Sequence, residues 1–275
     1  KFPAGKHVSF SCWRWSDSSQ ADAEQSAQAA VERIRQAIAF GRKPDRYLYG
    51  TTPLREEVLQ TIADPQGNVL AAVTRNQYGS VILNTSRVMF VDIDFPEPGV
   101  GEAPPCFFAR LFGGGKKKSL DSEYEQKTRA AVEEFVADRP GWNVRLYRTF
   151  AGLRGIVTHQ LFDPASSQTE EILQRLGADP LFIRLCKFQE CFRARLTPKP
   201  WRCGHYANTI RYPIENPSLA KQYQQWLEEY ERRQRDYAAC RWLGQVGAGQ
   251  VHPEAELVVE LHDFVTRCQA PLPLA

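Results

Sequence analysis

Two aspartates end an apolar segment in the stretch VMFVDIDFPEPG, residues 88–99. Side chains on a strand alternate between its two faces, so Asp92 and Asp94 share one face, while Val91 and Ile93 occupy the other. Two carboxylates this close repel each other, and burial would increase the cost. A divalent cation between them removes that cost, because Mg²⁺ and Mn²⁺ prefer carboxylate oxygens and keep positions open for a substrate. The spacing therefore indicates a site that holds Mg²⁺ or Mn²⁺ against phosphate oxygens; an acidic strand end facing water is the alternative.

A glycine-containing hairpin, RLYRTFAGLRGIVTH, follows at residues 145–159. Its glycines permit a tight turn and a close approach of the backbone to a ligand. Arg148 and Arg154 offer guanidinium groups that suit phosphate, and His159 ends the second strand. A single histidine is more often structural than catalytic, so the interest of His159 depends on its lying beside the D-x-D strand.

Basic side chains concentrate between residues 184 and 211, where seven Lys and Arg accompany one acid, Glu190. This local excess of +6 is larger than the net charge of the whole chain, which is +3. Four of the basic residues lie within one short segment, namely Arg193, Arg195, Lys199 and Arg202. Such a cluster suits phosphate or a nucleic-acid backbone, and Trp201 among them could stack on a base. A solvated basic face is the alternative.

Three cysteines and a histidine of the same region have donor atoms that suit Zn²⁺. They are Cys186, Cys191, Cys203 and His205, spaced C-x4-C-x11-C-x-H. This spacing is not that of a common zinc finger, and cysteine is also a frequent core residue, so zinc is the weaker metal hypothesis. Near the end of the chain, Glu260, His262 and Asp263 could complete a metal site or simply belong to the start of a capped helix.

Hydrophobic periodicity predicts the elements that would position these residues. Helices are expected at 21–40, 53–64, 120–138, 168–188 and 217–243. Strands are expected at 69–75, 78–84, 87–94, 144–149, 153–159 and 191–197. The segment from Phe95 to Ser119 is rich in proline and glycine, and its last part, GGGKKKS, indicates a flexible basic loop rather than a P-loop.

The middle of this series runs strand, helix, strand, strand, helix, strand. This is the order of the ferredoxin-like or RRM-like βαββαβ unit, also called palm-like. In that arrangement Asp92 and Asp94 would lie near residues 145–159. We therefore expect an α+β protein with an N-terminal α/β subdomain at 1–86, a palm-like catalytic core at 87–215 and a C-terminal helical extension at 216–275 packed on the core.

Composition limits the kind of protein and its location. The chain has 275 residues, 43% of them hydrophobic, which is enough for a sizeable core. The small net charge means that any nucleic-acid site must be local. No apolar run approaches the roughly 20 residues of a membrane span, and no signal-peptide pattern opens the sequence. Seven cysteines argue against a disulfide scaffold, so we expect a cytoplasmic protein without a membrane partner.

Three of these segments together resemble the motifs of archaeo-eukaryotic primases and primase-polymerases. They are FVDID, the AGLRG hairpin that ends in histidine, and FRARLTPK, which span about residues 88–202. In that superfamily the motifs are an apolar strand ending in D-x-D, a Ser/Gly-rich hairpin with a histidine, and an acid followed by a basic strand. The resemblance implies that Asp92 and Asp94 hold metal ions and that His159 touches the phosphates of a nucleotide. The basic side chains that it implies for phosphate or template are Arg193, Arg195 and Lys199.

Two features depart from the pattern of that superfamily. Its members usually place the histidine two residues after the hairpin glycine, where this chain has Val157, and His159 comes two residues later on the same face. The acid of the third motif has two candidates, Glu190 and Asp179. If neither completes the site, nucleotide binding without polymerase chemistry becomes the expectation.

The leading hypothesis is a divalent-metal-dependent nucleotidyltransferase that acts on nucleoside triphosphates and a DNA or RNA strand by two-metal displacement. Two alternatives remain open. One is a non-catalytic module with a palm-like fold that binds nucleotides or nucleic acid. The other is a metal-dependent phosphodiesterase or nuclease that uses the same carboxylates.

Overall fold

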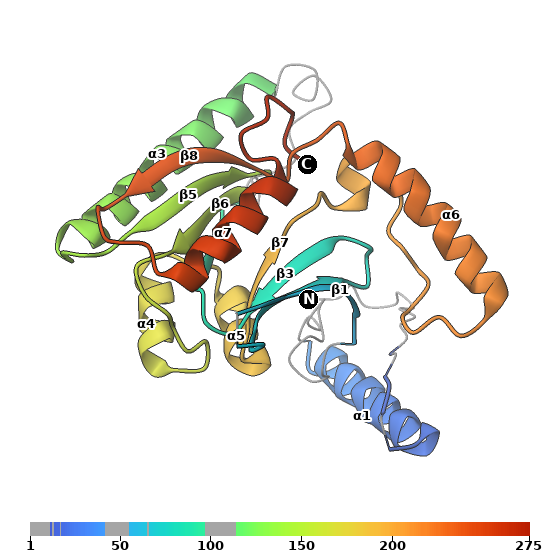
Figure 1. The fold of residues 1–275 in the computed structure, drawn as a ribbon. Coiled ribbons are helices and arrows are strands. Elements are labelled where there is room, and N and C mark those ends of the chain that lie inside the picture. Colours follow the sequence, from blue (N-terminus) through green and yellow to red (C-terminus); the bar gives the residue numbers. More distant parts are fainter. Residues whose placement is uncertain (1–11, 13, 17, 42–54, 65, 97–113) are drawn as a thin grey trace. The chain divides into compact units, whose positions relative to one another are not determined.

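The computed structural model describes residues 12, 14–16, 18–41, 55–64, 66–96 and 114–275. For residues 114–120 it describes the backbone alone. The chain separates into two compact units, Lys1–Leu54 and Arg55–Ala275. The described residues contain six α-helices and two antiparallel sheets, which confirms the α+β class (Figure 1). None of these helices is both long enough and apolar enough to cross a membrane.

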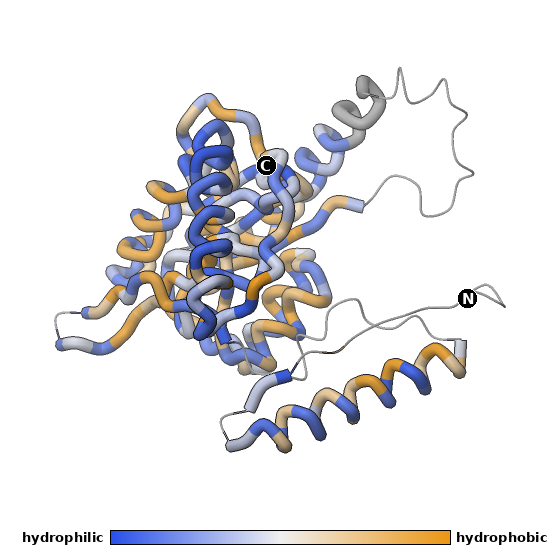
Figure 2. The backbone as a smooth tube through the Cα atoms, turned by 90° about the vertical axis from the view of Figure 1, so that its right-hand side faces the viewer, coloured by the Kyte–Doolittle hydropathy of each residue, from blue (hydrophilic) through white to orange (hydrophobic). Residues whose placement is uncertain are grey.

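The first unit contains one described helix, α1 (Gln20–Ala39), close to the expected range of 21–40. Ser19 caps it, and its side chain accepts a hydrogen bond from the backbone nitrogen of Asp22 at 3.2 Å. This satisfies one of the amide groups that a helix start leaves without an intrahelical partner. Hydrophobic and hydrophilic residues alternate along α1, as the periodicity predicted (Figure 2).

The first sheet of the second unit has the strand order β1-β2-β3-β7, with all neighbours antiparallel. Its strands are β1 (Glu57–Ala63), β2 (Val69–Arg75), β3 (Val81–Thr85) and β7 (Phe192–Arg195). The expectation of a helix at 53–64 was wrong where the structure describes it, because β1 pairs along β2 at the edge of the sheet. Val58, Thr61 and Ile62 are β-branched residues that suit this strand.

The second sheet has the order β4-β6-β5-β8, again antiparallel throughout. Its strands are β4 (Phe90–Asp94), β5 (Val144–Thr149), β6 (Gly152–Val157) and β8 (Cys240–Val246). β6 lies between β4 and β5 in this sheet, so β4 lies beside the β5–β6 hairpin. The expected fourth strand, β7, pairs with β3 in the other sheet, so it joins the predicted core to the predicted N-terminal subdomain. The division at 86 and 215 stays a prediction.

Helices cover both faces of the second sheet (Figure 1). α3 (Gly114–Ala137) lies on one face, where Val132 and Phe135 are buried in the main core. α7 (Pro253–Thr266) lies on the other, where the His262 ring is 4.7 Å from the Tyr147 ring. Residues 114–119 belong to α3, so the expected loop was wrong for that part, while 97–113 lie outside the described residues.

Two short helices, α4 (Ser167–Arg175) and α5 (Pro180–Gln189), occupy the stretch expected to be helical at 168–188. The last expected helix, 217–243, was wrong in its last third. α6 (Pro217–Gln234) ends early, and β8 then supplies the hydrogen bonds that the free edge of β5 requires. Strand pairing therefore overrides the helical spacing in that stretch.

α6 holds the segment after β7 in place. Trp226 and Tyr230 of α6 form a second buried cluster with Cys203, which follows the short helix η1 (Pro200–Arg202). The Tyr230 hydroxyl donates to the Pro198 carbonyl at 2.6 Å and lies 2.8 Å from the hydroxyl of Thr197. These contacts hold residues 197–203, which include two of the predicted phosphate-binding side chains.

Candidate functional site

The end of β4 lies beside the central hairpin, as expected. Asp94 pairs with Gly152 and Asp92 pairs with Arg154 across the antiparallel ladder. Directly paired residues in such a ladder point to the same face, so Asp92, Asp94 and Arg154 share one face of the sheet. A Cβ atom on Gly152 would lie 1.8 Å from the Ile93 carbonyl oxygen, so only glycine allows this close approach beside Asp94.

A third carboxylate, that of Asp179, joins those of Asp92 and Asp94. These three side chains are called the acidic group below. Its backbone nitrogen donates to the Asp92 carbonyl at 2.8 Å, which places the start of α5 against β4. Asp179 caps α5, and its side chain accepts a hydrogen bond from the Phe182 nitrogen at 2.9 Å. Burial, and then the charges of Asp92 and Asp179, raise the pKa of Asp94. Such mutual repulsion is what a bound cation would relieve.

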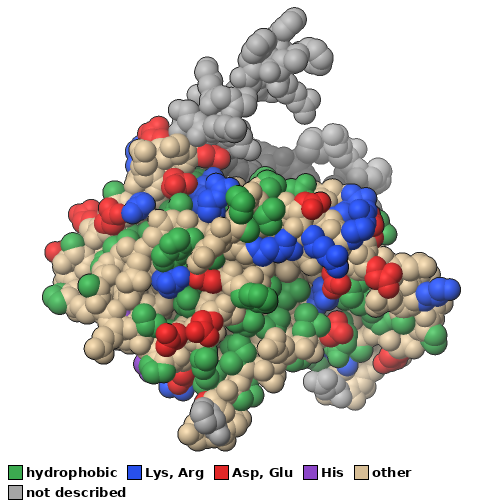
Figure 3. Space-filling model, turned by 45° about the horizontal axis from the view of Figure 1, so that its top comes forward, with side chains coloured by type: hydrophobic (Ala, Val, Ile, Leu, Met, Phe, Trp, Pro, Cys, Tyr) green, Lys and Arg blue, Asp and Glu red, His purple; other side chains and the backbone are tan. Residues whose placement is uncertain are grey.

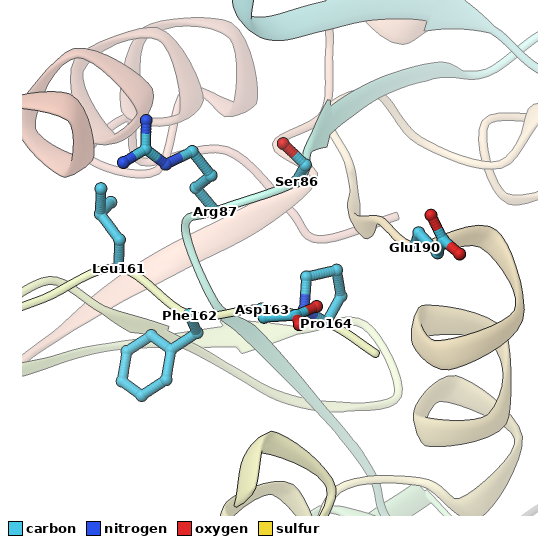
Figure 4. Close-up of a pocket in the computed structure, with 7 residues that line it drawn as sticks. All are labelled: Ser86, Arg87, Leu161, Phe162, Asp163, Pro164 and Glu190. Carbon is cyan, nitrogen blue, oxygen red and sulfur yellow. The ribbon is translucent and has the colours of Figure 1, made fainter. Parts of the chain in front are cut away.

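Glu190, the other candidate for the third acid, lies at the opposite end of α5. It follows the last residue of that ten-residue helix, which is about 15 Å long. There it lines a separate pocket of about 340 Å³ with Ser86, Arg87 and residues 161–164 (Figure 4). The structure therefore brings Asp179, and not Glu190, to the D-x-D pair.

Three of the predicted basic residues act on the acidic group electrostatically. Burial and the charge of Arg154 lower the pKa of Arg195 to about 10. Burial, together with Arg195 and Arg202, lowers the pKa of Lys199 to about 8, and Asp94 and Asp92 act in the opposite direction. Burial also lowers the pKa of Arg202, while the charges of Asp94 and Asp92 raise it.

The two sets of charges influence each other electrostatically but are not directly paired. Among the residues that the structure describes, no ion pair within 4.0 Å joins Asp92, Asp94 or Asp179 to Arg195, Lys199 or Arg202. Paired charges in contact would neutralise each other, so a separated arrangement leaves both sets able to bind a ligand that carries phosphate and a cation.

The remaining predicted arginines are engaged in contacts that stabilise the fold. Arg193 donates to both carboxylate oxygens of Glu56 at 2.8 Å. Arg148 donates to the Gly152 carbonyl at 2.8 Å, and its Nε lies 3.2 Å from a Glu125 oxygen of α3. Neither side chain is brought to the acidic group as a separate phosphate ligand.

His159 also lies away from the acidic group. β6 runs antiparallel to β4, so its last residue, Val157, lies beside Met89, which precedes β4. His159 comes after that end and packs on Trp142, with ring centroids 4.4 Å apart. Burial lowers the pKa of His159. Its surroundings are those of a structural histidine, at the end of β4 opposite Asp94.

A buried polar network under α7 holds Arg154 in place. Arg154 donates to the Arg195 carbonyl at 2.9 Å, and its Nη1 lies 3.3 Å from Nε2 of His262. Nδ1 of His262 lies 2.9 Å from Asp263, which also pairs with Arg145 at 2.6 Å. Nothing in the sequence pattern predicts this link, because it joins residues about a hundred positions apart. Two of the residues proposed to complete a metal site, His262 and Asp263, instead support the sheet.

The donor set of Asp92 and Asp94 fits a partly open site for Mg²⁺ or Mn²⁺, because Mg²⁺ is often bound by one or two carboxylates together with substrate phosphates. Within the described part of the chain, no group of three or more His, Cys, Asp and Glu side chains is arranged to hold a metal ion by itself. The zinc candidates are divided between two clusters, since Cys186 is in the main core and Cys203 packs with Trp226. Zinc binding by these four residues stays a prediction.

Comparison with protein-family models, with curated proteins and with solved structures gives no match. The surface is also not uniformly charged: basic, acidic and hydrophobic side chains are intermingled on the face shown in Figure 3. This agrees with the small net charge of +3.

Proposed function

We propose that this chain is a divalent-metal-dependent nucleotidyltransferase of the primase-polymerase type, acting on nucleoside triphosphates and a DNA or RNA strand. One observation carries the proposal: within the described residues, Asp92, Asp94 and Asp179 lie within electrostatic range of Arg195 and Lys199 but form no ion pair with them. A metal–triphosphate complex has charges of both signs and suits such a site.

Each side chain then has a defined task. Asp92 and Asp94 hold Mg²⁺ or Mn²⁺, and Asp179 adds a third negative charge close to them. When bound, the metal ions activate the attacking 3′-hydroxyl and stabilise the departing pyrophosphate. Arg195, Lys199 and the neighbouring Arg202 neutralise the triphosphate and orient it. His159 has no task in this scheme.

The proposal extends to the fold. The strand order β4-β6-β5 and the helix α3 between β4 and β5 support a palm-like βαββαβ core. Its fourth strand, β7, still passes beside β4 but takes its hydrogen bonds from β3. Arg195 ends β7, and the basic segment that continues from it contains Lys199 and Arg202.

Primer synthesis and primer extension with labelled nucleotides and Mn²⁺ test the proposal. Wild-type protein should incorporate nucleotide, and Asp92→Asn or Asp94→Asn should reduce the rate by at least about a hundredfold, as expected when a metal ligand or charge-stabilising group is lost. Asp138→Asn, which changes an exposed carboxylate at the end of α3, is the matched control. Unchanged incorporation in the double variant of Asp92 and Asp94 would contradict the proposal.

A second candidate is a module that binds nucleotides or nucleic acid without turnover. It is favoured by the position of His159 and by the lack, within the described residues, of a group with three metal ligands. This candidate predicts that Asp92→Ala changes binding while wild-type protein never incorporates nucleotide. Shortening of strands without any addition would instead indicate a phosphodiesterase or nuclease.

A further inference from the structure

Two large aromatic side chains are exposed beside the acidic group. Phe150 lies at the tip of the β5–β6 hairpin, where the Phe95 nitrogen donates to the Ala151 carbonyl at 2.9 Å. Trp201 lies in η1. Their residues are 46% and 48% exposed, whereas the aromatic residues of the main core are almost fully buried. Single exposed aromatic residues are common on protein surfaces, and exposure alone does not distinguish these two.

Each ring carries a cation from the proposed phosphate-binding set. The guanidinium carbon of Arg202 lies 4.1 Å from the centroid of the Phe150 ring. Nζ of Lys199 lies 5.6 Å from the centroid of the Trp201 ring. The rings of Tyr78 and Trp201 pack in a T-shaped arrangement, with centroids 5.6 Å apart and an interplanar angle of 89°, which limits the orientations open to the indole. The aromatic and basic groups therefore form one surface.

The backbone that carries this surface is anchored on both sides. η1 lies between Pro198, whose carbonyl accepts from Tyr230, and Cys203, which is buried with Trp226. The hairpin tip is tied to the end of β4 by the pairing of Gly152 with Asp94. A rigid aromatic face loses little conformational entropy on binding, and this favours stacking with a flat partner.

We propose that Phe150 and Trp201 form a platform on which unpaired bases of a single nucleic-acid strand stack, while Lys199 and Arg202 contact its phosphates. The proposal rests on the proposed function and identifies the place where its strand binds. The two rings of the platform lie on different segments, so each stacks on a different base. A free nucleotide has only one base and cannot occupy both rings. A duplex keeps its bases stacked inside the helix, so the platform favours single strands.

Binding of a labelled 15-nucleotide dT strand in EDTA, followed by fluorescence anisotropy, tests the platform without turnover. Trp201→Ala and Phe150→Ala should each weaken binding by about 5- to 150-fold, the range expected for one stacked base. Trp201→Phe should restore most of the affinity. Phe188→Ala, which removes a ring that is 47% exposed on α5, is the matched control and should bind as wild type does.

An abasic strand of equal length separates stacking from phosphate contact. It should bind wild type more weakly than dT does, and the loss of Trp201 should not weaken it further. Equal effects of Trp201→Ala on both strands, an effect on nucleoside triphosphate binding alone, or no strand binding by wild type would each overturn the platform. If primers are extended but the aromatic variants bind normally, the platform fails and the proposed function stands. If strand binding depends on Trp201 but nucleotide is never incorporated, the platform stands and the proposed function fails.

Discussion

His262 gives the folded state a dependence on pH that can be measured without knowledge of a substrate. Its ring is completely buried on α7, with Nε2 facing the guanidinium of Arg154 at 3.3 Å. Arginine can only donate a hydrogen bond, so Nε2 must accept it, and Nδ1 carries the proton toward Asp263. The ring is therefore neutral. Burial lowers the pKa of His262 to about 4, although Asp263 acts in the opposite direction.

The sign and size of the effect follow from linkage. The reference pKa of His262 is 6.5, so between pH 6.5 and about 4 the unfolded chain binds a proton that the folded chain does not. The free energy of unfolding therefore falls as the pH falls through this interval. At about 1.4 kcal/mol per pH unit, the full loss is about 3 kcal/mol, of which about 2 kcal/mol falls between pH 7 and pH 5.

Urea unfolding at pH 7 and pH 5 measures this loss. The variant His262→Gln keeps an acceptor near the position of Nε2 but cannot take up a proton. We expect wild type to lose about 2 kcal/mol more than the variant between the two pH values. Other groups titrate in both proteins, so their contributions cancel in the comparison.

Thr266→Val serves as the control on the same helix. It removes a buried hydrogen bond from the Thr266 hydroxyl to the His262 carbonyl at 2.6 Å, and it leaves the imidazole in place. Its stability should fall by a similar amount at both pH values, typically about 1 kcal/mol. An equal pH dependence in wild type and His262→Gln would refute the reasoning, because it would mean that the folded protein takes up the proton as readily as the unfolded chain.

Three further predictions concern the end of β4. Asp94→Asn should raise the free energy of unfolding at pH 7 by up to about 1 kcal/mol, because it removes repulsion from neighbouring carboxylates. In thermal melts, added Mn²⁺ should stabilise wild type but not this variant. Raising the pH from 7 to 9 should weaken metal-free ATP binding roughly tenfold in wild type, because the pKa of Lys199 is about 8 and its ammonium group loses its charge in this interval. Calorimetry should show a smaller change for Lys199→Arg, whose guanidinium stays charged. Gly152→Ala should cost about 1–3 kcal/mol in urea unfolding. Gly155→Ala, where the nearest atom would lie 3.3 Å away, should cost less, and the opposite order would contradict the packing described above.

The sequence by itself determined the parts of the fold and site that depend on neighbours along the chain. The alternation in β4 placed Asp92 and Asp94 on one face, and the glycines of the hairpin predicted its turn. Helical periodicity located α1 and the stretch that contains α4 and α5 to within a few residues. These features follow from local stereochemistry, so a window of about ten residues contains the necessary information.

Only the tertiary structure decided which segments meet. β1 and β8 are strands because open sheet edges were available to pair with them, although their own spacing suggested helices. Asp179 rather than Glu190 joins the acidic pair because the start of α5 hydrogen-bonds to β4. His159 is separated from that pair because β6 runs antiparallel to β4. Hydrogen bonds between distant segments depend on the free donors, acceptors and space that the partner offers, and periodicity within one segment carries no record of its partner.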